Sequence, residues 1–139
     1  RSLADFGQGF YTTTNLHQAK NWANERYRDL SQGGATRVWA AVLRFEIDRN
    51  LLAQLQVLFF LRADHPDYWD FVSYCQHGQG NHRLTGNYDI VWGPVSLWPQ
   101  TLCILGADQL SFHTPAGLAI LPSPTIEVEG SASGPKLQV

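Results

Sequence analysis

The spacing of apolar residues predicts an amphipathic helix over residues 15–30. Apolar side chains recur there every three or four positions, which places them on one face of a helix. These residues are Leu16, Ala19, Ala23, Tyr27 and Leu30. Asn15 is a suitable N-cap residue, and Gly33 and Gly34 follow the last turn, where glycine is favoured. We therefore expect a helix with one apolar face and one polar face.

A second helix is expected between Asp64 and Gly78. Asp64-His65-Pro66 combines an N-cap with a proline in the first turn, and apolar side chains then recur with helical spacing. They are Tyr68, Phe71, Val72 and Cys75. Because Cys75 falls on this apolar face, we expect a buried thiol, although the sequence also allows a single disulfide with Cys103.

Segments rich in β-branched and aromatic residues predict the strands. Residues 36–47 carry such side chains on both faces, which is typical of a strand inside a sheet. Residues 88–94 indicate a strand closed by a turn at Gly93-Pro94. Residues 102–105 and 109–114 indicate two further strands.

The other segments are ambiguous or polar. Residues 50–61 are apolar at nearly every position and fit either a short helix or a helix running into a strand. Residues 79–87 form a polar, glycine-bearing loop in this interpretation, and a short apolar turn follows Pro115. Beyond Pro122 the chain is rich in Pro, Ser and Gly, with at most an edge strand at residues 125–129.

The order of these elements predicts an α+β domain. Short strands mix with two or three helices and show no regular βαβ alternation, so the sheet should be mainly antiparallel. The chain has 139 residues, which is enough for one domain with a sizeable core. We expect this domain to span residues 1–121, and residues 122–139 to form a C-terminal extension that is mobile from Gly130 onward.

Charge and composition limit the classes of function. The formal net charge of −2 provides no overall basic field for a polyanion, so nucleic-acid binding would need a local patch. No apolar stretch approaches the ~20 residues of a membrane span, and no signal peptide is present, so we expect a soluble protein without a membrane partner. The chain begins with Arg1 and contains no methionine, so we expect a processed, excised or truncated piece of a longer polypeptide.

Several catalytic and metal-binding motifs are absent from the sequence. There is no phosphate-binding glycine loop, no Gly-x-Ser-x-Gly elbow and no His-Glu-x-x-His helix. His77 and His82 share one loop, but no acidic residue or cysteine accompanies them at ligand spacing. We therefore expect no metal site.

The segment from Asp5 to Trp22 is the strongest candidate for a site. Phe6-Gly7-Gln8-Gly9-Phe10-Tyr11 is a glycine-framed turn that leads into a short strand, and Trp22 lies eleven residues after Tyr11. Two glycines allow close approach to the backbone, and two aromatic rings could hold a flat ligand. The alternative interpretation is that Tyr11 and Trp22 are core aromatics.

This segment resembles the nicotinamide pocket of the ADP-ribosyltransferase superfamily, in the branch of diphtheria toxin and poly(ADP-ribose) polymerases. There, a Gly-x-Gly-aromatic-Tyr strand precedes a helix with a second aromatic residue. Three further blocks are similar to a bacterial branch long known only as a domain of unknown function. They are Trp69-Asp70-Phe71-Val72, Tyr88-Asp89-Ile90-Val91-Trp92-Gly93-Pro94-Val95 and Gln109-Leu110-Ser111-Phe112-His113-Thr114.

The resemblance implies an ADP-ribosyltransferase-like fold with a split, mainly antiparallel sheet, and NAD as the substrate. It implies that Tyr11 and Trp22 clamp the nicotinamide ring while the backbone of Gly9 and Phe10 holds its amide. Gln109 takes the position of the catalytic glutamate and would orient a ribose hydroxyl. Further residues are expected to line or support the pocket: Thr12, Thr13, Ser111 and His113.

The implied activity is transfer of ADP-ribose from NAD to a macromolecule, with release of nicotinamide, by a bacterial toxin or effector. A protein acceptor is favoured over a nucleic acid, and a cognate inhibitor protein is a further expected partner. The compartment stays open between the cytoplasm and delivery as an effector. Gln109 cannot ionise, and no ribose-binding motif precedes Asp5 in the chain, so two alternatives remain: a non-catalytic nucleotide- or partner-binding module, and an NAD glycohydrolase.

Overall fold

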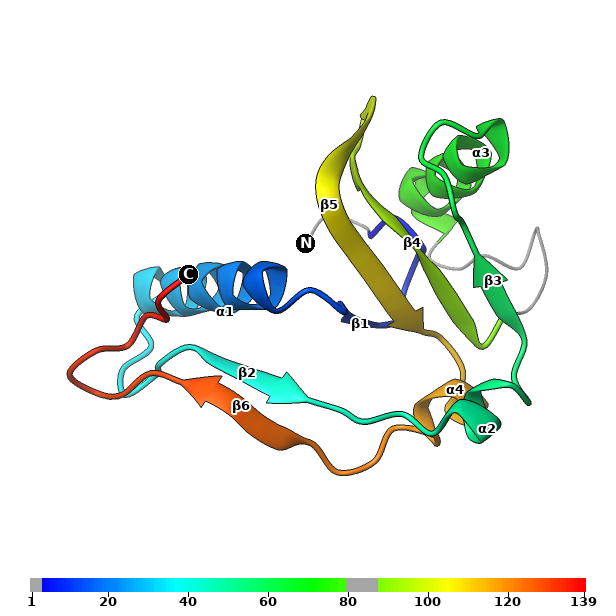
Figure 1. Cartoon of the computed structure of the whole chain (residues 1–139). Coiled ribbons are helices and arrows are strands. Elements are labelled where there is room, and N and C mark those ends of the chain that lie inside the picture. The colour runs from blue at the N-terminus through cyan, green and yellow to red at the C-terminus, as the bar shows by residue number, and fades with distance from the viewer. Residues whose placement is uncertain (1–3, 80–87) are drawn as a thin grey trace. The chain divides into compact units, whose positions relative to one another are not determined.

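The computed structural model describes residues 4–79 and 88–139, and its class is α+β, as predicted (Figure 1). The helices in these residues are α1 (Leu16–Gln32), α2 (Arg49–Leu52), α3 (Pro66–Tyr74) and α4 (Pro115–Leu118), with a π-helical turn η1 (Cys75–Gln79) after α3. The strands are β1 (Phe10–Thr12), β2 (Ala41–Arg44), β3 (Val57–Phe59), β4 (Ile90–Leu97), β5 (Gln100–Phe112) and β6 (Thr125–Glu129). Most of the polar loop expected at residues 79–87 lies outside the described residues.

The described chain forms two compact units. Unit 1 comprises the residues up to Thr14 together with Ile47–Ile120, and unit 2 comprises Asn15–Glu46 together with Leu121–Val139. The C-terminal segment expected as an extension therefore belongs to the same unit as α1 and β2. No helix in the described part of the chain is both long and apolar enough to span a bilayer.

Unit 1 is built on a four-stranded mixed sheet in the order β1-β5-β4-β3. β5 pairs antiparallel with β1 and β4, whereas β3 and β4 are parallel. The parallel pair was not expected, and it follows from the connection, because α3 lies between β3 and β4 in the sequence and allows a crossover. The segment that fitted a helix or a helix running into a strand is the latter, since α2 leads to β3.

Helix α3 packs against the sheet and forms the core of unit 1. His65 is the N-cap, because its Nδ1 accepts the Asp67 backbone N–H at 3.2 Å, and Pro66 occupies the first turn. The buried cluster consists of Phe6, Tyr68, Phe71, Val72, Cys75 and Val91. The thiol of Cys75 is fully buried, as predicted, and it forms no disulfide with Cys103.

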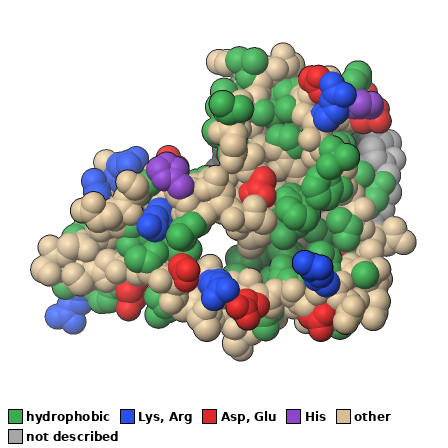
Figure 2. Space-filling view, in the orientation of Figure 1, with side chains coloured by type: hydrophobic (Ala, Val, Ile, Leu, Met, Phe, Trp, Pro, Cys, Tyr) green, Lys and Arg blue, Asp and Glu red, His purple; other side chains and the backbone are tan. Residues whose placement is uncertain are grey.

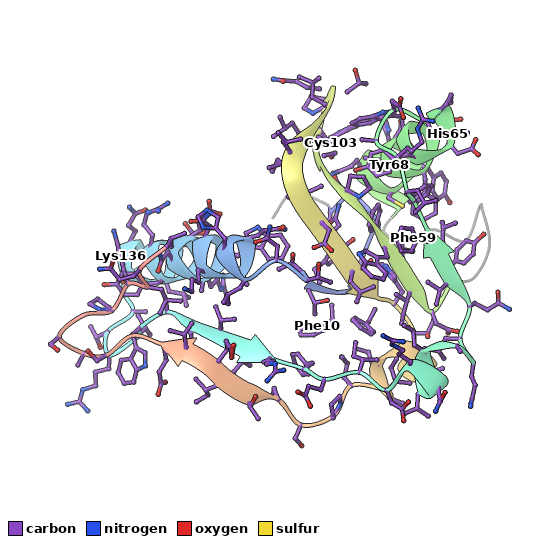
Figure 3. All side chains as sticks on the ribbon, in the orientation of Figure 1. Phe10, Phe59, His65, Tyr68, Cys103 and Lys136 are labelled. Atoms are coloured by element: carbon purple, nitrogen blue, oxygen red, sulfur yellow. The ribbon has the colours of Figure 1, made fainter. Side chains whose placement is uncertain are left out.

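The hydroxyl of Tyr68 connects α3 to the sheet. It donates a hydrogen bond to the carbonyl of Pro94 at 2.9 Å. Cys103 Sγ lies 3.7 Å from the Tyr68 hydroxyl oxygen (Figure 3). Burial raises the pKa of Tyr68, with smaller contributions from Cys103 and from the charge of Asp5, so the hydroxyl keeps its proton.

Strands β4 and β5 are longer than the sequence indicates. The turn predicted at Gly93-Pro94 is wrong: β4 continues to Leu97, and the register shifts between Pro94 and Ser96. Such a shift accommodates proline, which has no N–H for the ladder. β5 joins the two strands expected at residues 102–105 and 109–114 into one strand of 13 residues.

Unit 2 packs α1 against the two-stranded antiparallel sheet of β2 and β6. Asn15 caps the helix by accepting the Gln18 N–H at 3.0 Å, as expected from the sequence. Ala40, Val42 and Leu137 form the buried cluster, and the residues packed against it are Ala19, Ala23, Tyr27 and Val128. Leu16 and Leu30, at the two ends of the predicted apolar face, are exposed.

The strand predicted over residues 36–47, inside a sheet, is wrong in length and environment. Only Ala41–Arg44 form β2, and β6 is its one partner among the described residues. Arg37 has a positive φ of 57°, which interrupts extended backbone before the strand. Of the four strand residues only Val42 is buried, so an apolar composition did not mean burial on both faces.

The last residues, expected to be mobile, are hydrogen-bonded within unit 2. Asn24 accepts the Leu137 N–H at 2.7 Å and donates to the Leu137 carbonyl at 3.0 Å. The Ala40 N–H donates to the Pro135 carbonyl at 2.8 Å. One apolar residue, Leu137, fills the space between α1 and β2 and holds a segment that is otherwise rich in Ser, Gly and Pro.

Candidate functional site

The glycine turn before β1 is closed by the side chain of Tyr11. Gly7 has a φ of 84°, a conformation that favours glycine, and its N–H donates to the Ala4 carbonyl at 3.1 Å. The Tyr11 hydroxyl accepts the Phe6 N–H at 3.0 Å and donates to the Gly7 carbonyl at 2.6 Å. The phenol therefore bridges the turn, which is a structural contribution that sequence reasoning did not foresee.

The Tyr11 ring lies between two other rings and is partly exposed. The Phe6 ring stacks with it at a centroid distance of 6.5 Å, and the His113 ring meets it edge-on at 6.1 Å. Phe6 is completely buried in the core cluster, whereas Tyr11 is at intermediate exposure. Tyr11 therefore packs on the core and leaves part of its surface accessible, and its role in ligand binding stays a prediction.

His113 explains why position 9 is a glycine. Its Nδ1 lies 2.8 Å from the Gln8 carbonyl, so this nitrogen carries the proton that is donated. A Cβ on Gly9 would lie 2.7 Å from the same nitrogen and 2.9 Å from the Phe112 carbonyl, closer than real side chains approach. The imidazole therefore holds the turn beside the end of β5.

Ser111 supports His113 from inside the core. Ser111 is opposite Tyr11 in the sheet register and is completely buried. Its Oγ lies 2.7 Å from His113 Nε2 and 3.0 Å from the Val91 carbonyl oxygen, and its single proton can go to only one of these two acceptors. Ser111 and His113 are two residues apart, so their side chains lie on the same face of the sheet, which also carries Tyr11.

Gln109 is buried in a polar network and not at an open surface. Only 5% of its surface is exposed, and its Nε2 donates to Asp5 Oδ2 and to the Pro94 carbonyl, both at 2.8 Å. Asp5 precedes the glycine turn, and its carboxylate also accepts hydrogen bonds from Ser96 and Gln76. The carboxylate closest to Gln109 was thus missed by sequence reasoning, because its partners are distant in the chain.

Thr12 and Thr13 attach β1 to β5. Thr12 Oγ1 donates to the Leu110 carbonyl at 2.7 Å, and Thr13 Oγ1 donates to Asp108 Oδ1 at 2.5 Å. Asp108 also accepts hydrogen bonds from Thr14 and from the indole N–H of Trp92. Burial alone would raise the pKa of Asp108, but these hydrogen bonds outweigh it and hold the pKa below its usual value.

Phe10 lies on the other face of the sheet from Tyr11. It pairs with Phe112 across the strands, at a ring distance of 6.5 Å, and is 43% exposed (Figure 3). Apolar side chains also gather over β3 and β4 (Figure 2), where Val57 and Phe59 are exposed. The backbone of Gly9 and Phe10 is expected to hold an amide. Gly9 immediately precedes the edge strand β1, Phe10 is its first residue, and both residues are exposed.

Trp22 belongs to unit 2, whereas Tyr11 belongs to unit 1. Trp22 lies on α1 and is partly exposed, next to Ala23, which packs on the core of that unit. The clamp formed by Tyr11 and Trp22 stays a prediction. Within the described residues there is no group of three or more His, Cys, Asp or Glu that could hold a metal ion.

Residues 1–97 match a family model described as protein of unknown function (DUF3990). The chain belongs to this family. The DUF3990 match includes the glycine turn, α1, α3 and β4, and it ends before β5, so Gln109, Ser111 and His113 lie outside it. No curated protein and no solved structure matches the chain.

Proposed function

We propose that the chain is an ADP-ribosyltransferase module that binds NAD and transfers ADP-ribose to a macromolecule, releasing nicotinamide. The observation that supports this most is the meeting of four distant sequence blocks in unit 1. Three of them contribute neighbouring strands, β1, β5 and β4, and the fourth belongs to α3, which packs on the same sheet. These strands and this helix carry the blocks that resemble the superfamily.

The chemistry of the proposed reaction fits the residues around this turn. Cleavage between nicotinamide and ribose passes through an oxocarbenium-like state, so the site must hold a flat leaving group and tolerate positive charge. The partly exposed ring of Tyr11 offers one face for nicotinamide, and the accessible backbone of Gly9 and Phe10 offers groups for its amide.

The other predicted residues act mainly by supporting the pocket. Ser111 and His113 hold the turn against β5, and Thr12 and Thr13 fix β1 to the same strand. Gln109 would orient a ribose hydroxyl. We include in the same proposal that the fold is ADP-ribosyltransferase-like, with a split sheet. This part of the proposal rests on the four blocks.

A second candidate, of another class, is a module that binds a nucleotide or a partner protein without catalysis. The observation that favours it is the position of Gln109, which is buried and donates both amide protons to protein acceptors. An NAD glycohydrolase would use the same pocket with water as the acceptor. As a toxin or effector, the module would act on a protein target and be held inactive by a cognate inhibitor.

Calorimetric titration tests whether the chain binds NAD, which the transferase and the glycohydrolase both require. We expect binding that is lost in Tyr11→Ala, because this variant removes the aromatic face offered to nicotinamide. Leu61→Ala, in the same unit, is a control at an exposed position and should bind normally. Absence of NAD binding by the unaltered chain would contradict the proposed function.

The acceptor is tested with NAD labelled in the adenylate part. Incubation with a bacterial or host extract should transfer label to protein when the module is a transferase. Nicotinamide release without labelled macromolecule indicates the glycohydrolase, and NAD binding without release indicates the non-catalytic module. Purified inhibitor candidates can then be recognised by loss of the labelling.

A further inference from the structure

The carboxylate of Asp5 is the centre of a buried polar network. Only 7% of Asp5 is exposed, and no ion pair with a cation is present at this residue among the described residues. Its Oδ1 accepts from Ser96 Oγ at 2.5 Å and from Gln76 Nε2 at 2.9 Å. Its Oδ2 accepts from the Ser96 N–H at 2.7 Å and from Gln109 Nε2 at 2.8 Å. Four donors therefore stabilise one buried charge.

This network determines which way the amide of Gln109 points. Asp5 Oδ2 and the Pro94 carbonyl can only accept hydrogen bonds, and both lie 2.8 Å from the same atom of Gln109. That atom must be the nitrogen, because an amide oxygen would repel both partners. The amide therefore has a single orientation, with its carbonyl oxygen Oε1 directed away from Asp5.

The oxygen Oε1 accepts no hydrogen bond from any residue that the structure describes. A buried carbonyl without a donor is unfavourable, because it has lost its hydrogen bonds to water. Gln109 is 95% buried, so this acceptor calls for a donor that the described residues do not supply.

We propose that Asp5 is a positioning residue that fixes the Gln109 amide so that Oε1 accepts a hydrogen bond from a ribose hydroxyl of the ligand. This inference rests on the proposed function. The hydrogen bond to the Asp5 carboxylate also polarises the amide, which strengthens Oε1 as an acceptor. Asp5 thereby places a full negative charge one side chain away from a site where positive charge develops on the sugar.

The variants of Asp5 separate positioning from simple packing. Asp5→Asn can keep an oxygen opposite Gln109 and turn its NH2 toward Ser96 and Gln76, whose hydroxyl and amide can both reverse their roles. Asp5→Ala removes the acceptor and frees the amide of Gln109. Ser96→Ala is the matched control, because it removes a donor to the same carboxylate and leaves the Asp5–Gln109 bond in place.

The experiment combines NMR of the Gln109 side-chain amide with nicotinamide-release kinetics on the complete chain. We expect slowly exchanging Gln109 amide protons in the unaltered protein, in Asp5→Asn and in Ser96→Ala. In Asp5→Ala we expect fast exchange, with kcat lowered about tenfold and KM nearly unchanged. Asp5→Asn should restore most of kcat.

The outcomes distinguish this inference from the proposed function. Fast amide exchange in the unaltered protein, which needs no variant, overturns the inference even if Asp5→Ala does not fold. Equal kcat in Asp5→Ala and the unaltered protein overturns the inference and leaves the proposed function standing. An unaltered protein that neither binds NAD nor releases nicotinamide overturns both.

Discussion

Asp5 and Gln109 are 104 residues apart in the chain and are joined by a hydrogen bond of 2.8 Å from Gln109 Nε2 to Asp5 Oδ2. The bond connects the segment that precedes the glycine turn with β5. On the other side of the turn, the Tyr11 ring on β1 meets the ring of His113, which follows the last residue of β5. The turn is therefore held rigidly beside β5, which is what a preorganised binding site requires.

Removal of the Tyr11 hydroxyl should loosen the turn. In Tyr11→Phe the Phe6 N–H and the Gly7 carbonyl lose their partner, and Phe6 is fully buried. We expect the free energy of unfolding to fall by about 1–3 kcal/mol in urea denaturation. Tyr74→Phe serves as the control, because it removes a tyrosine hydroxyl elsewhere in the same unit. An unchanged unfolding midpoint would show that the phenol does not close the turn.

A side chain at position 9 should collide with His113. Gly9→Ala places a Cβ against His113 Nδ1 and the Phe112 carbonyl, and we expect a loss of about 1–3 kcal/mol in stability. The double variant with His113→Ala should recover only part of this loss, because the contact with the Phe112 carbonyl remains. Gly134→Ala is the control, since its nearest atom would be 3.8 Å away. Equal effects in both glycine variants would contradict this account.

The Asp108 carboxylate should make the attachment of β1 sensitive to acid. Its pKa is lower in the folded protein than in the unfolded chain, so the stabilisation is present above about pH 4, the unfolded pKa, and is lost as the pH falls through the folded pKa. In acid titrations followed by unfolding, Asp108→Asn and Thr13→Val should both weaken this dependence. A wild-type dependence in Asp108→Asn would exclude Asp108 as its source.

The two cysteines should differ in reactivity. Burial, with a smaller effect of Asp5, raises the pKa of Cys75 to about 12, and the side chain is inaccessible. Iodoacetamide at pH 8, with mass-spectrometric readout, should therefore modify Cys103 first, because it is partly exposed. Cys75 should react only after denaturation. Equal native rates would mean that α3 opens from the sheet.

Local sequence patterns predicted the parts of the fold that depend on neighbouring residues. Helical spacing and Asn15 located α1, and the blocks at β1, β4 and β5 were located by their composition. The path of β4 through Pro94 was missed because a register shift depends on the partner strand. The short β2 was missed because exposure depends on which strand pairs with it.

The candidate site was predicted less completely than the fold for a related reason. The glycine turn, Tyr11, Ser111 and His113 were identified from motifs, and the structure brings these four features together. Asp5 and Asp108 act through partners that are about a hundred residues away or spread over several strands, as with Ser96 and Thr13. No local spacing encodes such contacts, so they are seen only in the three-dimensional structure.

The most direct test of the account is the release of nicotinamide from NAD by the purified chain, followed by chromatography over time. We predict time-dependent release that Tyr11→Ala abolishes and that the exposed control Leu61→Ala preserves. If the folded chain releases no nicotinamide above the rate of spontaneous hydrolysis, the assignment as an ADP-ribosyltransferase is contradicted.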